Sequence, residues 1–516
     1  MGRAKIPENQ KLATALEALH KLTGLDHGVI KGSQLKQVDR EILLRTGFLK
    51  DFCKGWYFLS DPGADPGDTT PFFAHYFEFL SRYLSERFGQ NYCLSAEHSL
   101  LLHAQTNIVP AQITVIVHGN VNQKLDVHAN YSLFVYSVKN LIPANLKTSV
   151  AGIQCYSPAA ALVSLSPKHY QSHGHDIQIV MHKIDDPLAI AGLVEHNTLG
   201  VSRLIGAYRQ IGKQDFADAI LKQLTNIGYE IREIENPFDA QAVVTYMEIR
   251  NPLYSRVKLL WDICRDDIIA LKPAVPLLAF TETEYLAAVE AIRIDDAYHS
   301  LSIERYRVSP ELIQNIAAGY WNPQSEADKK HRDALAAKGY LEAFNLVKQA
   351  ANQAYLKQKS AAELFIEEHQ RWFAQLFMPS VAAGLLKRQD LIGYRRHPVF
   401  LSGSKHVPPH FEHILDGLEA LKDCLLSEQD AFVKAVMAHF LIGYIHPFMD
   451  GNGRTARFTM NVMLAEGRYP WTIIPVEMRK EYMLVLEKAS VEKDIKPFAQ
   501  FISERIKVAY DKLRSV

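Results

Sequence analysis

The chain has 516 residues, of which 48% are hydrophobic and 22% charged, and this ordinary globular composition excludes wholesale disorder. Its 57 basic residues balance 57 acidic ones, so no overall charge attracts nucleic acid or an anionic membrane. The start MGRAKIPENQ has no apolar signal core, and no apolar run reaches the about 18 residues that a membrane span needs. We therefore expect a multidomain cytoplasmic protein without a membrane partner.

Residues 1–62 predict a winged helix-turn-helix. Apolar residues at helical spacing precede a second helix, which we expect over 33–46. Two β-rich runs follow over 48–53 and 56–59, and the two residues between them include a glycine, which is typical of a hairpin. Residues 1–60 hold ten basic and six acidic residues, a net charge of +4. This bias favours DNA binding through a recognition helix, and the alternative is a module for protein contacts alone.

Residues 70–225 mix β-rich and helical runs and predict an α/β module. We expect strands over 113–117, 132–136 and 177–181, with helices over 74–88, 187–196 and 201–226. The histidines His169, His173 and His175 have no carboxylate or cysteine at ligand spacing, so we expect a loop there rather than a metal site. The rest of the chain predicts helix after helix, with a helical linker over 226–284 and a mainly helical domain over 285–516.

The segment His446-Pro-Phe-Met-Asp-Gly-Asn-Gly-Arg-Thr-Ala-Arg457 contains the strongest chemical signal in the chain. Helical patterns over 430–445 and 454–464 place its two glycines in a loop that opens directly into a helix. Glycine permits a close backbone approach, so several N–H groups of the loop can point at one anion. The positive end of the following helix dipole strengthens such a phosphate site.

Four side chains of this segment complete the chemistry. Arg454 and Arg457 lie three residues apart on one helix face and can hold further phosphate oxygens. Asp450 is a hard oxygen ligand of the kind that Mg²⁺ uses beside phosphates. His446 is the group suited to general-base work near neutral pH. Together these residues predict phosphoryl or nucleotidyl transfer.

The segment matches the signature HPFx(D/E)GNGRxxR and therefore resembles the Fic (Fido) family. Flanking residues at the positions usual for that family extend the resemblance over about 285–510, namely Gly393, Tyr394, Arg395, His439, Arg479 and Tyr482. The resemblance implies a protein adenylyltransferase, which transfers AMP from ATP to a Tyr, Thr or Ser hydroxyl of a target protein or of itself. It also implies a homodimer. The motif leaves UMP or another nucleotide open as the donated group.

The resemblance assigns roles to the residues of the motif. His446 would be the base, and Asp450 would hold Mg²⁺, with Mn²⁺ as the alternative ion. Arg454 would contact the β-phosphate of ATP and Arg457 the γ-phosphate. The anion hole would be formed by the backbone of Gly451, Asn452 and Gly453. A small β-hairpin, the flap, would dock the target by strand addition through Val399, Phe400 and Leu401.

A second motif resembles the inhibitory helix of the same family, (S/T)xxxE(G/N), in the class that places it before the catalytic core. Ser300 and Glu304 lie four residues apart on a helix expected over about 285–307. The resemblance implies that Glu304 pairs with Arg457 and blocks productive docking of the γ-phosphate. Arg305 stands where the family has Gly or Asn, which leaves the fit of this helix in question.

The N-terminal half is similar to abortive-infection antitoxins of the AbiEi type. The segments 47–59 and 155–162 carry this looser resemblance. It leaves a second hypothesis, a DNA-binding regulator of toxin–antitoxin type whose Fic fold senses nucleotide. A de-AMPylase, in which Glu304 orients a water, stays open as a further activity. The intact His446 favours the transferase, because a nucleotide sensor has no need of a base.

Overall fold

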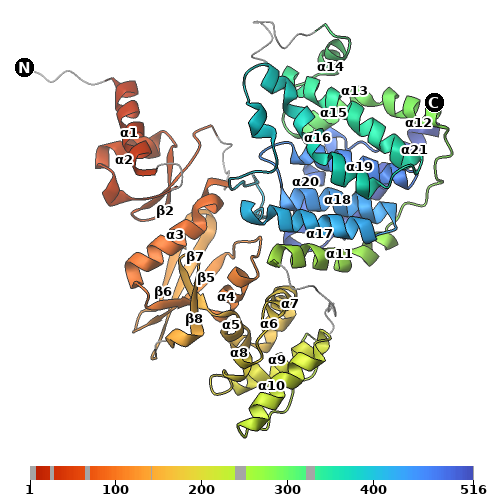
Figure 1. Cartoon of the computed structure of the whole chain (residues 1–516). Helices are drawn as coiled ribbons and strands as arrows, with labels where there is room; N and C mark the ends of the chain where they lie inside the picture. Colours follow the sequence, from red (N-terminus) through yellow and green to blue (C-terminus); the bar gives the residue numbers. More distant parts are fainter. Residues whose placement is uncertain are drawn as a thin grey trace, which may run out of the picture. The chain divides into compact units, whose positions relative to one another are not determined.

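The computed structural model describes residues 7–23, 28–63, 70–140, 142–238, 251–320, 332–401 and 403–514. The chain divides into two compact units, which Figure 1 shows in the colours of the sequence. The first unit comprises Met1–Pro252 and Val399–Val407, and the second comprises Leu253–Pro398 and Pro408–Val516. Among the described helices, none combines the length and the apolar character that crossing a membrane requires.

The N-terminal part of the first unit combines helices with one hairpin. The helices are α1 (Glu8–Thr23), the 3₁₀ turn η1 (Gly32–Gln34) and α2 (Gln37–Arg45); the strands are β1 (Val29–Lys31), β2 (Leu49–Cys53) and β3 (Trp56–Leu59). The three strands form an antiparallel sheet in the order β1-β3-β2. The predicted hairpin is therefore confirmed, while the winged-helix identity of this region stays a prediction. Phe52 of β2 stacks at 4.4 Å on Phe79 of α3 (Thr70–Phe88), so the hairpin shares an aromatic core with the next helix.

A four-stranded mixed sheet follows in the same unit. Its members, with the helix α4 (Ala96–His103) between the first two, are β4 (Tyr92–Leu94), β5 (Gln112–His118), β6 (Gln123–Val127) and β7 (Tyr131–Val138). The order is β4-β5-β7-β6, and only β5 and β7 run parallel. A separate hairpin pairs β8 (Lys147–Val150) with β9 (Ile153–Tyr156). The strands predicted over 113–117 and 132–136 are confirmed as β5 and β7.

Helices complete the first unit, and one of them replaces a predicted strand. They are α5 (Pro158–Ser164), α6 (Pro167–Ser172), α7 (Gly174–His182), α8 (Leu188–Ala191), α9 (Thr198–Gln210) and α10 (Gln214–Asn226). The strand expected over 177–181 is wrong, because this stretch is α7. A short apolar run looks the same in a buried strand and in a buried helix, and every residue of 176–182 is buried. The helix expected over 201–226 is two helices, separated at Gly212, which has a positive φ of 81°.

The histidines of this unit lie in or beside helices rather than in the expected loop. His169 belongs to α6 and His175 to α7, and His173 lies between these helices. A carboxylate absent from the local sequence approaches them in space, because Glu97 lies 3.4 Å from His169 and 3.1 Å from His173. Hydrogen bonds with Asp176 and Glu97 raise the pKa of His173 to about 9. Nowhere in the described chain are three or more His, Cys, Asp or Glu side chains placed to hold a metal ion.

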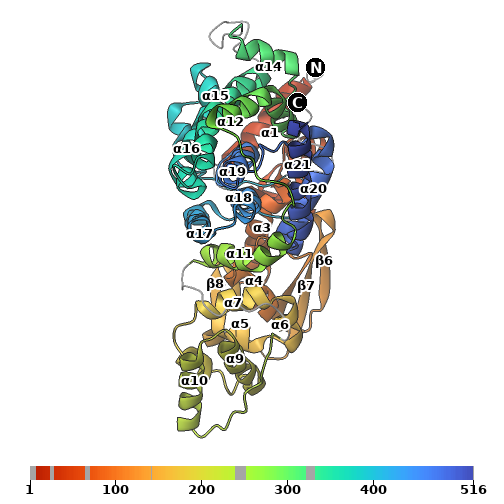
Figure 2. The same cartoon turned by 90° about the vertical axis from the view of Figure 1, so that its right-hand side faces the viewer.

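The second unit is a helical bundle, as predicted. Its helices are α11 (Pro252–Ala270), α12 (Glu282–Ala291), α13 (Arg293–Ile303), α14 (Pro310–Ala317), α15 (Arg332–Tyr355), α16 (Ala361–Ala382), α17 (Ile414–Ser427), α18 (Ala431–Ile445), α19 (Asn452–Glu466), α20 (Arg479–Glu487) and α21 (Lys496–Arg514). Short turns of helix are η4 (Arg388–Leu391), η5 (Phe411–His413), η6 (Val476–Met478) and η7 (Lys488–Glu492). Helices α18 and α19 lie side by side inside the bundle in both views (Figures 1 and 2). Nearly every residue of α18 is buried, so the loop that joins it to α19 has a rigid support.

The predicted β-hairpin at Val399, Phe400 and Leu401 is wrong in its secondary structure. Among the described residues of Val399–Val407 there is no strand, and the segment belongs to the first unit. His406 forms one isolated antiparallel bridge with Ile108, which is the only strand-like pairing that the described part of the segment makes. An extended run with a few β-branched residues predicts a strand, but a strand needs a partner that sequence alone does not supply.

Candidate functional site

The α18–α19 connection is a tight loop with two left-handed backbone positions. α18 begins at Asp430, whose carboxylate accepts hydrogen bonds from the N–H groups of Phe432 and Val433. It ends at His446, where φ is +51°, and α19 begins after Gly451, where φ is +78°. The second position explains one glycine of the motif, since residues with a Cβ rarely adopt this conformation. The chain can therefore reverse between the two helices in six residues, 446–451.

The side chain of Asn452 holds this loop closed. Its Oδ1 accepts a hydrogen bond from the N–H of Phe448 at 2.9 Å, and its Nδ2 donates to the Phe448 carbonyl at 2.8 Å. Both polar ends of the buried amide are thus used within the protein. The side chain of Asn452 therefore has a structural task that the sequence did not reveal, while anion binding by its backbone N–H stays a prediction.

His446 stands at the start of the loop as a neutral imidazole. Its Nδ1 lies 3.3 Å from the carbonyl oxygen of Gly443. A carbonyl only accepts hydrogen bonds, so Nδ1 carries the proton and Nε2 keeps its lone pair. Burial lowers the pKa of His446 to about 4, and the nearby charge of Arg395 acts in the same direction. At neutral pH the ring is therefore in the form that can accept a proton.

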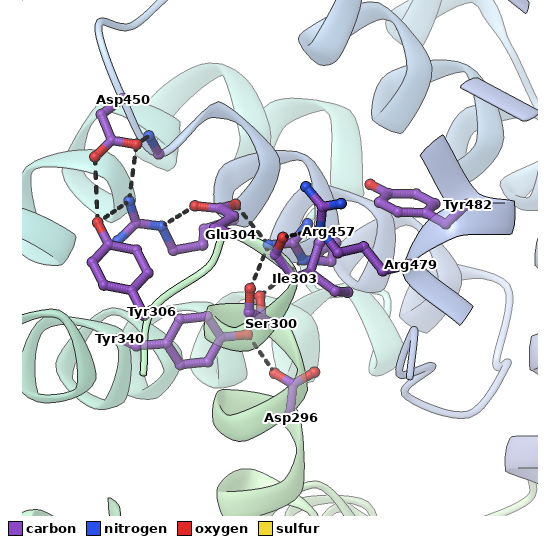
Figure 3. A network of polar contacts seen from close by, with 12 residues as sticks. Asp296, Ser300, Ile303, Glu304, Tyr306, Tyr340, Asp450, Arg457, Arg479 and Tyr482 are labelled. Atoms are coloured by element: carbon purple, nitrogen blue, oxygen red, sulfur yellow. Dashed lines mark hydrogen bonds and ion pairs between the residues drawn. The ribbon is translucent and has the colours of Figure 1, made fainter. Parts of the chain in front are cut away.

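Glu304 joins the two arginines of the motif. Its Oε2 accepts from Nε of Arg454 at 2.8 Å and its Oε1 from Nη2 of Arg457 at 2.7 Å. Arg457 also donates to Ser300, with Nε on the hydroxyl at 2.8 Å and Nη2 on the carbonyl at 3.0 Å (Figure 3). Burial lowers the pKa of both guanidinium groups, but Glu304 and the other neighbouring groups together outweigh it, so the pKa of each is raised. Sequence analysis predicted the pair with Arg457 but missed the pair with Arg454.

The Glu304 carboxylate lies against the first turn of α19. A Cβ added to Gly453 would lie only 2.5 Å from Oε1 of Glu304, so the absence of a side chain there makes room for an oxygen. Nη1 of Arg454 is buried without a hydrogen-bond partner. A buried guanidinium N–H without an acceptor is costly, and such an orphan at a helix N-terminus indicates a place for one more anionic oxygen. The carboxylate thus fills the space beside Gly453 and leaves one buried N–H of Arg454 without an acceptor.

Asp450 lies beside this anion site with its side chain half exposed. Its Oδ1 accepts from the N–H of Gly451 at 2.6 Å and from Nη2 of Arg454 at 3.3 Å, and its Oδ2 accepts from the hydroxyl of Tyr306 at 3.3 Å. The Tyr306 hydroxyl also accepts from Nη2 of Arg454 at 3.3 Å (Figure 3). A single accessible carboxylate next to a phosphate site fits Mg²⁺, which keeps several waters and binds through one or two carboxylates.

The segment that presents Glu304 is shorter than predicted. The single helix expected over 285–307 is wrong, because α12 ends at Ala291 and α13 runs only from Arg293 to Ile303. Glu304 therefore follows the helix end, where the Ile303 carbonyl accepts from Nε of Arg479 at 2.7 Å. Arg305 has a φ of +66°, which is the left-handed conformation that Gly and Asn adopt most readily. This explains physically why Gly or Asn would suit position 305.

The structure brings most of the predicted residues together at one place. These are Ser300, Glu304, Asp450, Gly451, Gly453, Arg454 and Arg457, linked by the contacts described above. The sequence missed Tyr306, whose only signal was its position two residues after Glu304. It also gave no role to Arg395, which is buried and donates to the carbonyl of His446 at 2.7 Å.

Comparison with known proteins shows which family this region resembles. Residues 361–464, which include the loop and both arginines, match the model of the Fic/DOC family. This part of the C-terminal region is thus similar to the Fic/DOC family. The chain is 39% identical over 115 residues to "Protein adenylyltransferase Fic" of Drosophila willistoni, and that stretch is 22% of each chain. It is 28% identical over 274 residues to the protein of the same name from Nematostella vectensis, or 52% of this chain and 58% of that one.

The chain thus spans from about a fifth to just over half of the length of these curated relatives. Solved structures of Fic proteins match more distantly. A structure of Fic-1 from C. elegans is 17% identical, covers 69% of this chain and 98% of its own, and has a TM-score of 0.36. A Fic domain containing signaling protein from Bacteroides thetaiotaomicron is 17% identical, covers 48% of this chain and 94% of its own, and has a TM-score of 0.34.

Proposed function

We propose that the chain is a protein adenylyltransferase that transfers AMP from ATP to a Tyr, Thr or Ser hydroxyl of a target protein or of itself. The relatives that share the Fic/DOC domain carry this activity in their names. The observation that carries the proposal is the anion site at the N-terminus of α19. There a carboxylate fills part of a cradle with two buried arginines, one of which has an N–H without a partner.

Each residue of the site would then have one task. The N–H groups of Gly451, Asn452 and Gly453 and the helix dipole would hold phosphate oxygens. Arg454 would hold the β-phosphate and Arg457 the γ-phosphate of ATP. Mg²⁺ bound at Asp450 would neutralise charge on the leaving pyrophosphate.

The transfer itself would need one general base and a single displacement at the α-phosphorus of ATP. The target hydroxyl oxygen attacks the α-phosphorus of ATP, and its proton passes to Nε2 of His446. The bond between the α-phosphorus and the bridging oxygen breaks, and pyrophosphate leaves with that oxygen. The product is an AMP ester of the hydroxyl, with no covalent intermediate on the enzyme.

Glu304 would act as a built-in brake on this reaction. Its carboxylate and the terminal phosphates of ATP require the same guanidinium groups, and one acceptor excludes the other. The present contacts would therefore represent the inhibited state, in which Ser300 and Glu304 occupy Arg457. Tyr306 adds a contact to Asp450, so the metal carboxylate is engaged in the same state.

The proposal is tested by intact-mass measurement after incubation with Mg²⁺ and ATP. We expect Glu304→Gly to gain AMP at least about tenfold faster than the wild type, because one lost charged hydrogen bond is worth 1.5–3 kcal/mol. The double variant Glu304→Gly, His446→Ala should gain none. Glu311→Gly is the matched control, since Glu311 lies on α14 and should behave as the wild type. Equal rates for the wild type and Glu304→Gly, or AMP retained in the double variant, would contradict the proposal.

A further inference from the structure

Arg395 makes three hydrogen bonds to carbonyl oxygens that are far apart in the sequence. Nε donates to His446 at 2.7 Å, Nη1 donates to His397 at 3.0 Å, and Nη2 donates to Pro409. The backbone N–H of the same residue donates to the Pro447 carbonyl at 2.9 Å. Only 5% of Arg395 is exposed, so these carbonyls replace the water that the guanidinium gives up.

The three carbonyls belong to two functional regions. His446 is the proposed base, and its left-handed backbone, with φ of +51°, persists only where neighbouring groups hold it. His397 and Pro409 flank the residues 398–408, which include the predicted target-docking residues 399–401. One guanidinium therefore fixes the backbone of the base and both ends of this segment.

We propose that Arg395 is a positioning residue that holds His446 and the ends of the docking segment in one fixed geometry. This inference rests on the proposed function, since it assigns the docking segment and the base to the same transfer. With these carbonyls held, the backbone of the base and the two ends of the docking segment keep fixed positions. Much of an enzyme's rate enhancement comes from placing the reacting groups correctly. A displacement of one of these groups by about 1 Å lowers the rate about a hundredfold.

The chemistry of the side chain explains why an arginine is needed. A guanidinium offers five N–H donors in a rigid plane, so it can serve three carbonyls in different directions. A lysine ammonium at the end of a flexible chain cannot span the same three acceptors. The positive charge also lowers the pKa of His446 and so favours the neutral imidazole.

The test uses the full-length chain with Glu304→Gly as the parent. In this parent we expect Arg395→Ala and Arg395→Lys to lower AMP gain at saturating ATP by about a hundredfold. The dissociation constant of ATP, measured by calorimetry, should stay within about twofold, because the phosphates are held by α19 rather than by Arg395. Added guanidinium ion should restore part of the transfer in Arg395→Ala but none in His446→Ala. Arg396→Ala is the matched control, because Arg396 is the neighbouring exposed arginine.

Two results would overturn the inference. One is a rate of transfer in Arg395→Ala that equals the rate of the parent. The other is a loss of ATP affinity in Arg395→Ala as large as the loss of transfer, which would indicate a general structural role. If the parent itself gains no AMP, the proposed function fails. The effect of Arg395 on the position of His446 is then tested by NMR of the chain with ¹³C-labelled histidine. The ring signal of His446, assigned by its loss in His446→Ala, should move in Arg395→Ala and Arg395→Lys. An unmoved signal would contradict the inference independently of catalysis.

Discussion

Glu304 offers one carboxylate to two guanidinium groups, and both guanidinium groups are buried. The two positive charges therefore share this carboxylate, and Arg454 has Asp450 as a second acidic partner at 3.3 Å. Such a group of charges is held together by its hydrogen bonds. Removing the carboxylate leaves Arg454 with the half-exposed Asp450 and Arg457 with its contacts to Ser300. The free energy that this costs the folded protein would be recovered when the phosphates of ATP arrive. The same contacts thus explain both the resting state and the proposed affinity for a polyphosphate.

The protonation of His446 predicts the pH dependence of transfer. Burial lowers its pKa from 6.5 to about 4, so the neutral base is the major form throughout the range from pH 5.5 to pH 7.5. We expect the rate of AMP gain in Glu304→Gly to change by less than about twofold over this range. A base with an unshifted pKa of 6.5 would lose about tenfold between the same limits. Initial rates in Glu304→Gly at constant ionic strength measure the difference, and a half-maximal rate near pH 6.5 would contradict the assignment.

Sequence could predict the members of the site better than their arrangement. The motif from His446 to Arg457 predicted which residues gather at the loop, and the structure places Asp450, Gly453, Arg454 and Arg457 there around Glu304. The roles of His446 as base and Asp450 as metal ligand stay predictions. The contact of Glu304 with Arg454 could not be predicted, since it depends on where the chain goes after α13 ends. For the same reason Tyr306 and Arg395 were missed as parts of the site. Their contacts join segments 51 to 148 residues apart.

At the scale of the element, the turn after α13 holds Glu304 in place at the expense of backbone strain. Arg305 has a positive φ of 66°, which costs a residue with a side chain about 1–2 kcal/mol. Arg305→Gly should therefore raise the local opening free energy of this turn by roughly 0.5–1 kcal/mol, after the greater chain entropy of glycine is included. Amide hydrogen exchange of residues 300–306 measures this change.

Arg305→Ala is the control for this prediction. It removes the same side chain but keeps the Cβ that makes the left-handed conformation unfavourable, so it should give no such gain. AMP gain in Arg305→Gly should stay as low as in the wild type, since the contacts of Glu304 do not involve the Arg305 side chain. Equal protection in the glycine and alanine variants would show that strain at this position is not what the substitution relieves.

The elements themselves were predictable to different degrees. The hairpin β2–β3, the strands β5 and β7 and the helices around the motif followed from periodicity and turn residues. The helix α7 was predicted as a strand, because an apolar run that is buried on all sides has no periodicity to separate the two. The expected hairpin near residue 400 failed for a different reason. A strand is a pairwise structure, and the described residues of this segment have only the single bridge of His406 with Ile108.

At the scale of the whole molecule, the open question is whether the first unit binds DNA or another protein. Two basic residues of the helix predicted as the recognition helix contact other groups of the protein. Arg40 donates to the Gly32 carbonyl at 2.7 Å, and Arg45 pairs with Glu8 at 3.3 Å. The same helix carries Asp39 and Glu41. The helix therefore carries charges of both signs rather than a purely basic face.

We therefore expect the full chain to bind its own promoter DNA only weakly and without sequence preference. A mobility-shift assay should show a complex at 50 mM salt that disappears near 200 mM salt, as expected for a few phosphate contacts. An unrelated duplex of the same length should compete equally well. A complex that survives 200 mM salt and resists this competitor would restore the DNA-binding regulator as the function of the first unit.

The central claim is that Glu304 and the γ-phosphate of ATP compete for the guanidinium group of Arg457. Calorimetry of ATP and ADP binding in the His446→Ala background, with and without Glu304→Gly, tests it most directly, because no transfer occurs. With Glu304 present, ATP and ADP should bind with nearly equal affinity, since the γ-phosphate finds its arginine engaged. Without Glu304, ATP should bind about 10 to 100 times more tightly than ADP, the value of a charged hydrogen bond. The same ratio of affinities in both variants would contradict the account.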